Sequence, residues 1–401
     1  MMRIFLAGLF LLLAPSVFGG EPYRPDKPDA VLARVTPASD PGAARLSQLR
    51  KSLDQSPERV GLAVEYARAA IEQARATADP RYLGYAQSAL APWWGRADPP
   101  DPVRLLRATI AQRRHEFGRA IADLDAVLAA QPQHAQARLT RASLHTVQAR
   151  YEPALLDCAA LTGQVRTLIV AACAAPPASL SGSAPAALNA LESALAADAS
   201  VNAGTRVWAL TIAAEIADRL GRADLAAERF EQAITAADGD DPYLLNAYSD
   251  FLLERGEPAA VVRLLADHQA IDAALLRLAM ANKRLAEIGN AQAASRFESQ
   301  RDTLAARFEA AQRRGDTVHR REQAMFELYL RERPERALWL ARANWRDQKE
   351  PLDARILLEA ALAAKAPAEA RPVLQWLKAH SVEAPRLRDL AGQLEAMADP
   401  A

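Results

Sequence analysis

Residues 101–134 read DPVRLLRATIAQRRHEFGRAIADLDAVLAAQPQH, and residues 135–161 continue as AQARLTRASLHTVQARYEPALLDCAAL. The two stretches match when one is shifted by 34 residues. The paired positions are Arg104 with Arg138, Arg107 with Arg141, Ala108 with Ala142, Phe117 with Tyr151, Ala120 with Ala154, and Asp123 with Asp157. A period of this length in an apolar, Ala-rich sequence is typical of helix–turn–helix units that stack, because one unit alone cannot bury its apolar face. The sequence therefore predicts an all-α solenoid of stacked helix pairs.

The same pattern recurs along most of the chain. The clearest repeats are expected at 101–134, 135–165, 207–240 and 241–268, followed by helix pairs within 317–380 and a single cap helix at 385–397. Upstream, we expect a helix pair at 57–75 and 80–94, with Ser56 as an N-cap before a proline at the first helical position. Residues 43–401 would then form one solenoid.

Two places depart from the pattern. Pro176 and Pro177 lie where a first helix should continue, so we expect that helix to be kinked or shortened. Residues 271–314 read as a longer helix pair that is broken near Gly289 and Asn290.

One string carries a specific family resemblance. FGRAIADLDAVLAAQP, residues 117–132, resembles the second helix of a tetratricopeptide repeat, with Ala120, Leu124, Val127 and Pro132 at the signature spacings. The resemblance covers most of residues 55–395, and it implies a right-handed superhelix that binds a protein segment in a concave groove. DPRYLGYAQSALAPWW and ARANWRDQKEPLDARILLEAAL resemble a group of exported bacterial tetratricopeptide proteins.

In that family the first helix of each pair lines the groove. Carried over to this chain, the candidate groove residues are Leu105, Thr109, Gln112, Arg113, Leu139, Ser143, Thr146, Trp208, Thr211, Glu215 and Asp218. Trp208 is the strongest candidate, because interface hot spots favour tryptophan, although a packing role between repeats stays open. The other tryptophans named here are expected in the core: Trp93, Trp94, Trp339, Trp345 and Trp376. Leu105 and Thr109 stand where some family members use Lys and Asn to clamp a terminal carboxylate, which argues against that ligand.

Arginine and aspartate recur together at the repeat spacing. Arg107 with Asp123, and Arg141 with Asp157, are interpreted as structural ion pairs, and a basic strip for an acidic partner is the alternative.

The first residues, MMRIFLAGLFLLLAPSVFGG, have a basic start, a short apolar run and small residues before position 20. This pattern predicts a signal peptide at 1–19, followed by a Pro-rich leader at 20–42. The chain is then expected to be periplasmic or secreted, with no membrane insertion after cleavage. A retained anchor is the alternative, but the apolar run is short for a bilayer span.

Cys158 and Cys173 are the only cysteines, and they lie symmetrically about a turn at Thr162–Gln164. Because an exported protein meets an oxidising environment, we expect a disulfide between them. Two buried thiols in adjacent helices are the alternative.

Charge and motif content limit the function classes. The 49 basic and 49 acidic side chains balance, whereas nucleic-acid-binding domains normally carry a basic excess, so no nucleic-acid partner is expected. No histidine pair has the i, i+4 spacing of a helical zinc site, and no Gly-rich loop suits a phosphate. We therefore expect no metal, cofactor or catalytic residues. The prediction is a non-catalytic scaffold that binds a protein partner. The alternatives are a structural subunit of an envelope export or assembly complex and, less favoured, an enzyme with its site in 271–350.

Overall fold

The computed structural model describes residues 41–398, and all regular structure within this range is helical. The expected signal peptide and almost all of the leader lie outside the described residues. The N-terminal helices are α1 (Pro41–Gln55), α2 (Val60–Thr77), α3 (Arg81–Ala89) and α4 (Ala91–Trp94). The helix expected at 57–75 is present as α2, but its expected start at Pro57 with a Ser56 cap is wrong, because Ser56 and Arg59 form the turn that follows α1, with the Arg59 amide donating to the Ser56 carbonyl at 3.0 Å.

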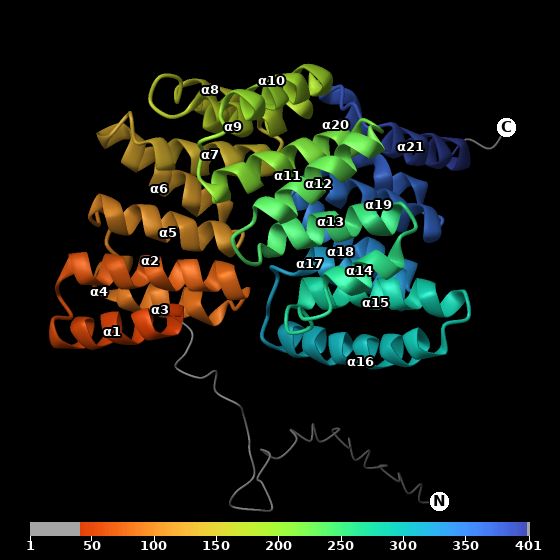
Figure 1. Cartoon of the computed structure of the whole chain (residues 1–401), viewed down its shortest axis with the longest axis horizontal. Helices are drawn as coiled ribbons and strands as arrows, with labels where there is room; N and C mark the ends of the chain where they lie inside the picture. Colours follow the sequence, from red (N-terminus) through yellow and green to blue (C-terminus); the bar gives the residue numbers. More distant parts are fainter. Residues whose placement is uncertain (1–40, 399–401) are drawn as a thin grey trace, which may run out of the picture.

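The stretch with the strongest repeat forms four helices. They are α5 (Asp101–Arg113), α6 (Phe117–Ala130), α7 (Ala135–Val147) and α8 (Tyr151–Ala159). Figure 1 shows them stacked one on the next in the orange to yellow part of the chain. The small side chains expected between paired helices are buried, with exposed fractions of 0% for Ala108, 0% for Ala120, 2% for Ala142 and 0% for Ala154, which confirms that prediction.

Replacing Ala142 with leucine is expected to destabilise the fold by about 1–3 kcal/mol, because the larger side chain overpacks a closed helix contact. Urea denaturation measures the change. Ala122→Leu on the exposed face of α6 is the matched control and should change the free energy of unfolding by less than about 0.5 kcal/mol. Equal effects of the two substitutions would contradict the assigned register.

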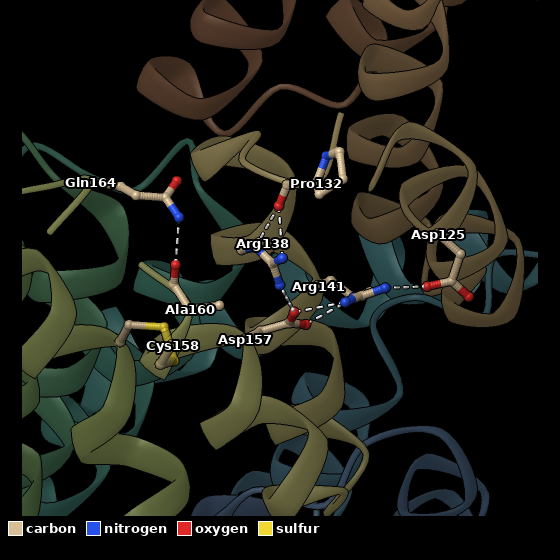
Figure 2. A network of polar contacts seen from close by, with 9 residues as sticks. Asp125, Pro132, Arg138, Arg141, Asp157, Cys158, Ala160 and Gln164 are labelled. Carbon is tan, nitrogen blue, oxygen red and sulfur yellow. Dashed lines mark hydrogen bonds and ion pairs between the residues drawn. A yellow bond between two sulfur atoms is a disulfide. The ribbon is translucent and has the colours of Figure 1, made fainter. Parts of the chain in front are cut away.

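The Arg–Asp pairs are structural, as interpreted from the sequence. Arg107 binds Asp123 through two hydrogen bonds of 2.7 and 2.6 Å, and both side chains are buried. One repeat later, Arg141 binds Asp157 at 2.8 and 2.6 Å (Figure 2). These pairs link the first and second helices of each unit, so Arg107 and Arg141 do not form a free basic strip.

The middle of the chain forms three further pairs. They are α9 (Thr167–Ser179) with α10 (Ala184–Ala197), α11 (Ala203–Arg219) with α12 (Ala223–Ala236), and α13 (Pro242–Glu254) with α14 (Pro258–Leu264). The prolines do not shorten α9: Pro176 and Pro177 lie inside the helix, which continues past them to Ser179 although each proline removes one intrahelical amide donor.

The C-terminal part begins with a long pair, α15 (Asp272–Glu287) and α16 (Ala291–Arg313). The break between them lies where it is expected: Gly289 has a positive φ of 94°, and the Asn290 side chain caps α16 by accepting from the Ala293 amide at 3.0 Å. The remaining elements are α17 (Arg320–Met325), the π-helix η1 (Phe326–Leu330), α18 (Pro334–Asp347), α19 (Pro351–Ala363), the 3₁₀-helix η2 (Pro367–Ala370), α20 (Arg371–Ala379) and α21 (Pro385–Ala398).

The C-terminal helices do not extend the stack outward but turn back onto the middle repeats (Figure 1). The indole Nε1 of Trp376 donates to the Tyr151 hydroxyl at 2.9 Å, and the Lys349 amide donates to the Val147 carbonyl at 2.8 Å. The Glu383 carboxylate accepts from the Ala184 amide at 2.6 Å. One apolar core therefore runs from Tyr151 in α8 to Leu394 in α21.

Candidate functional site

The expected groove residues on α5 and α7 offer little free surface. The Thr109 and Thr146 hydroxyls each donate to a carbonyl one turn earlier in their own helix, at 3.0 and 2.9 Å. Leu105 and Leu139 are half-buried against the apolar core of their repeats, and Gln112 is half-buried as well. Only Arg113 and Ser143 of this group are exposed.

The four candidates on α11 divide into different environments. Thr211 is 2% exposed and donates to the Val207 carbonyl at 2.8 Å, so its placement on an accessible groove wall is wrong. The cause is that α11 packs against α9, α10, α12 and α13, which leaves only a narrow strip of the helix uncovered. Glu215 and Asp218 are half-buried, and Trp208 is 38% exposed.

The side of α11 that carries Glu215 and Asp218 faces the chain's own C-terminal part. Glu350, which precedes α19, is near enough to Glu215 to contribute to its raised pKa. Burial raises the pKa of Asp218, and the positive charge of Arg355 in α19 opposes that increase. Glu254 at the end of α13 forms ion pairs with Arg355 and with Arg386 of α21. The sequence predicts an open concave groove, whereas α19 and the segment before it occupy much of that space.

One accessible part of this surface is the strip formed by Trp208 and Glu215 on α11 and Tyr243 on α13, called here the α11–α13 strip. Trp208 and Glu215 are seven residues apart, so they lie on the same helix face two turns from each other. The Tyr243 hydroxyl donates to the Glu215 carboxylate at 2.7 Å. The Tyr243 ring is 57% exposed, which makes it one of the most exposed large aromatic residues of the described chain.

The start of α13 is held in place by Asp241. Its carboxylate caps the helix by accepting from the amides of Tyr243 and Leu244 at 3.0 and 3.2 Å. The same side chain forms an ion pair with Arg75 of α2 at 3.2 Å, so the N-terminal part of the chain reaches the start of α13. Tyr243 was not among the expected groove residues. Its position in the sequence could have indicated this role, because Tyr243 lies at the start of the first helix of the next repeat, about one period after Trp208.

Glu215 carries a carboxyl group with an unusual pKa. Desolvation by burial raises the pKa from 4.5 to about 7, against the lowering effect of the hydrogen bond from Tyr243. Glu350 and Asp218 raise the pKa further, and Arg219 lowers it. Arg219 forms no ion pair with Glu215, and its guanidinium donates instead to the Ser179 hydroxyl at 2.6 Å.

The Tyr243 hydroxyl, which donates to Glu215, also has an unusual pKa. Burial raises its pKa well above the ordinary value, although the ring is more than half exposed. The ring is open to solvent, and the hydrogen bond from its hydroxyl to Glu215 lies at the surface.

Glu215→Gln is expected to stabilise the protein at pH 8 by about 2–3 kcal/mol, because the amide keeps an acceptor for Tyr243 and removes a desolvated charge. The pKa of Glu215 is raised in the folded state, so the folded chain binds this proton more tightly than the unfolded chain. The stability of the native protein therefore falls as pH rises from 4.5 to 7, and the advantage of the variant grows over the same range. Urea denaturation at pH 5 and pH 8 measures the difference in the free energy of unfolding between the variant and the native protein.

Glu309→Gln on the exposed face of α16 is the matched control for that measurement, and its effect should stay below about 0.5 kcal/mol at both pH values. A Glu215→Gln variant whose advantage does not change between pH 5 and pH 8 would contradict a raised pKa of Glu215 that lies between these two values.

Cys158 and Cys173 form a disulfide between α8 and α9, with their Cα atoms 5.6 Å apart (Figure 2). This distance lies within the ordinary range for such bonds. The bond lies one residue after Asp157, so it anchors the end of the best repeat to the next helix pair.

The described residues, 41–398, hold no group of three or more His, Cys, Asp or Glu side chains placed to bind a metal ion. Within the same range, no helix is long and apolar enough to cross a membrane.

Helix pairs with a 34-residue period, small residues buried between the paired helices, and a terminal helix packed on the last pair define the fold as an α-solenoid of the tetratricopeptide-repeat type. No family model matches the chain, and no curated protein matches it.

Solved structures with a similar arrangement have low sequence identity. A tetratricopeptide repeat protein from Parabacteroides merdae is 14% identical, with 65% of this chain and 92% of that chain covered and a TM-score of 0.41. The human IFIT1 dimer with m7Gppp-AAAA is 15% identical, with 89% of this chain and 86% of that chain covered and a TM-score of 0.42. The APC/C hetero-tetramer Cut9-Hcn1 is 12% identical, covers 80% of this chain and 52% of that chain, and has a TM-score of 0.39.

Proposed function

We propose that this chain is a non-catalytic protein-interaction scaffold of the periplasm or the secreted space, and that it holds a partner segment at the α11–α13 strip. The supporting observation is the pair of exposed aromatic side chains, Trp208 and Tyr243, on the first helices of two neighbouring repeats. Solvent-exposed tryptophan and tyrosine side chains on a concave surface are typical of interface anchors.

The proposal narrows the binding surface that the sequence predicts. Since the segment around Lys349 and helix α19 contacts α7 and α13, a partner has access to the remaining strip and not to the full length of the first helices. A protein partner is favoured over a nucleic acid, because the basic and acidic side chains of the chain are equal in number.

Site-directed photo-crosslinking tests this function. A photoreactive amino acid replaces Trp208 in the full chain, which is then irradiated in envelope extract. We expect a discrete cross-linked protein product. Trp339 on α18 is the matched control, because it is also an exposed tryptophan, at 56%, where the sequence predicts a core residue. The same products from both positions, or none from Trp208, would contradict a partner site at the strip.

Localisation is tested separately. The residue pattern before position 20 supports export, and mass spectrometry of the envelope fraction should then find a mature N-terminus near Gly20. A protein that keeps Met1 would contradict processing by signal peptidase.

A further inference from the structure

We infer that the α11–α13 strip binds a cationic side chain, a lysine or arginine of the partner protein, with Glu215 as its counter-ion and the rings of Trp208 and Tyr243 beside it. This inference rests on the proposed function, and it adds the chemistry by which the partner is recognised.

The first step is the missing ion pair of Glu215. The buried carboxylates Asp123, Asp157 and Asp353 have arginine partners, in order Arg107, Arg141 and Arg321. Glu215 has a single hydrogen bond, from the neutral hydroxyl of Tyr243, and no ion-pair partner among residues 41–398. A desolvated carboxylate without a cation is unfavourable, so an incoming cation would gain more here than at an exposed acid.

The second step is that the nearby arginines already have other partners. Arg219 lies on the same helix but donates to Ser179. Arg321 reaches the interior from α17, where Asp353 and Glu350 accept all of its hydrogen bonds. Neither Arg219 nor Arg321 therefore forms an ion pair with Glu215, and Glu350 and Asp218, which also act on Glu215, are negative.

The third step is the aromatic surroundings. A cation gains free energy over the face of a tryptophan or tyrosine ring, and the gain increases when water is excluded. The chain contains this contact elsewhere, since the guanidinium of Arg336 lies 4.4 Å from the ring centroid of Trp339. Among residues 41–398 no cation lies over the ring of Trp208 or Tyr243, and both side chains are exposed. The aliphatic part of a partner lysine or arginine between them would contact the faces of the two rings, and its charged end would contact the Glu215 carboxylate.

The fourth step is a link between binding and protonation. Glu215 has a pKa of about 7, so only about a tenth of the molecules carry the negative charge at pH 6, and about nine tenths carry it at pH 8. A ligand that needs the ionised carboxylate binds in proportion to that fraction. Lysine stays protonated over this range, so affinity should rise about tenfold from pH 6 to pH 8.

The test uses the full chain and fluorescein-labelled tetralysine, with anisotropy measured at pH 6 and pH 8. We expect about tenfold tighter binding at pH 8. A peptide of four acetyl-lysines, which has the same shape without the charges, should bind at least tenfold more weakly than tetralysine at pH 8. Glu215→Gln should weaken tetralysine binding at pH 8 about tenfold and remove the pH dependence. A pH dependence caused by a histidine would instead persist in this variant. Trp208→Ala should weaken binding with the pH dependence retained.

Glu309→Gln is the control, because it removes the same charge from the exposed face of α16, and it should leave the affinity unchanged. Circular dichroism checks that each variant keeps its helix content. Equal binding of tetralysine by the native chain and by Glu215→Gln, or tighter binding at pH 6, would overturn the inference. If Trp208 still cross-links to a partner in that case, the proposed function stands and only the recognition chemistry is wrong; if neither result appears, both are wrong.

Discussion

Replacing Asp157 with asparagine is expected to lower the free energy of unfolding by about 3–5 kcal/mol, because the change leaves two arginines without their buried counter-charge. Asp157 is 3% exposed and accepts from Arg141 at 2.8 and 2.6 Å and from Arg138 at 3.1 Å (Figure 2). This carboxylate also raises the pKa of the Arg141 guanidinium, mainly through their hydrogen bonds. Urea denaturation followed by circular dichroism measures the loss.

Asp125→Asn is the matched control for this prediction. Asp125 also binds Arg141, at 2.6 Å, but its side chain is 55% exposed, and a surface ion pair contributes less than about 1 kcal/mol. A loss of stability at Asp157 no larger than at Asp125 would show that the repeated Arg–Asp pair does not hold the two helices of a unit together.

The 34-residue match predicts the local structure well because its signals are local. The helical spacing of apolar residues, Pro132 and the small side chains at Ala108 and Ala142 determine where α5 to α8 begin, end and approach each other. The Arg–Asp pairing follows from the same register, since Arg141 and Asp157 belong to the two helices of one unit. These features need no information from distant parts of the chain.

The return of the C-terminal helices is not visible in any local pattern. The contacts that define it join residues far apart in the sequence, such as Ala184 with Glu383 and Tyr151 with Trp376. Each partner looks like an ordinary surface residue when its own helix is read alone. The expectation of an open groove failed for this reason, and Thr211 was placed on a free surface that neighbouring helices cover.

Trp208 and Glu215 were predictable because helical spacing places them on one face of a first helix. Tyr243 was missed because its role depends on a contact across two repeats, the hydrogen bond to Glu215. The absence of a counter-ion for Glu215 also needs the full structure, since it depends on where Arg219 and Arg321 direct their guanidinium groups.

A second large loss of stability is expected when Trp376, which joins the C-terminal helices to α8, is replaced. Trp376→Ala should cost about 3–5 kcal/mol, because the change leaves a cavity in a continuous core. The indole is 5% exposed, packs edge-to-face on Trp345 at 5.4 Å between centroids, and donates to the Tyr151 hydroxyl at 2.9 Å. Calorimetry or urea denaturation measures the loss, and hydrogen exchange should show reduced protection in α8 and α20 before α5 and α6.

Two further variants separate the contributions of Trp376. Trp376→Phe keeps most of the ring and leaves the buried Tyr151 hydroxyl without its donor, so about 1–3 kcal/mol should be lost. Trp339→Ala removes an exposed tryptophan from the neighbouring α18 and should cost less than about 1 kcal/mol. If Trp376→Ala is no more damaging than Trp339→Ala, the contact of Trp376 with α8 does not hold the C-terminal helices in position.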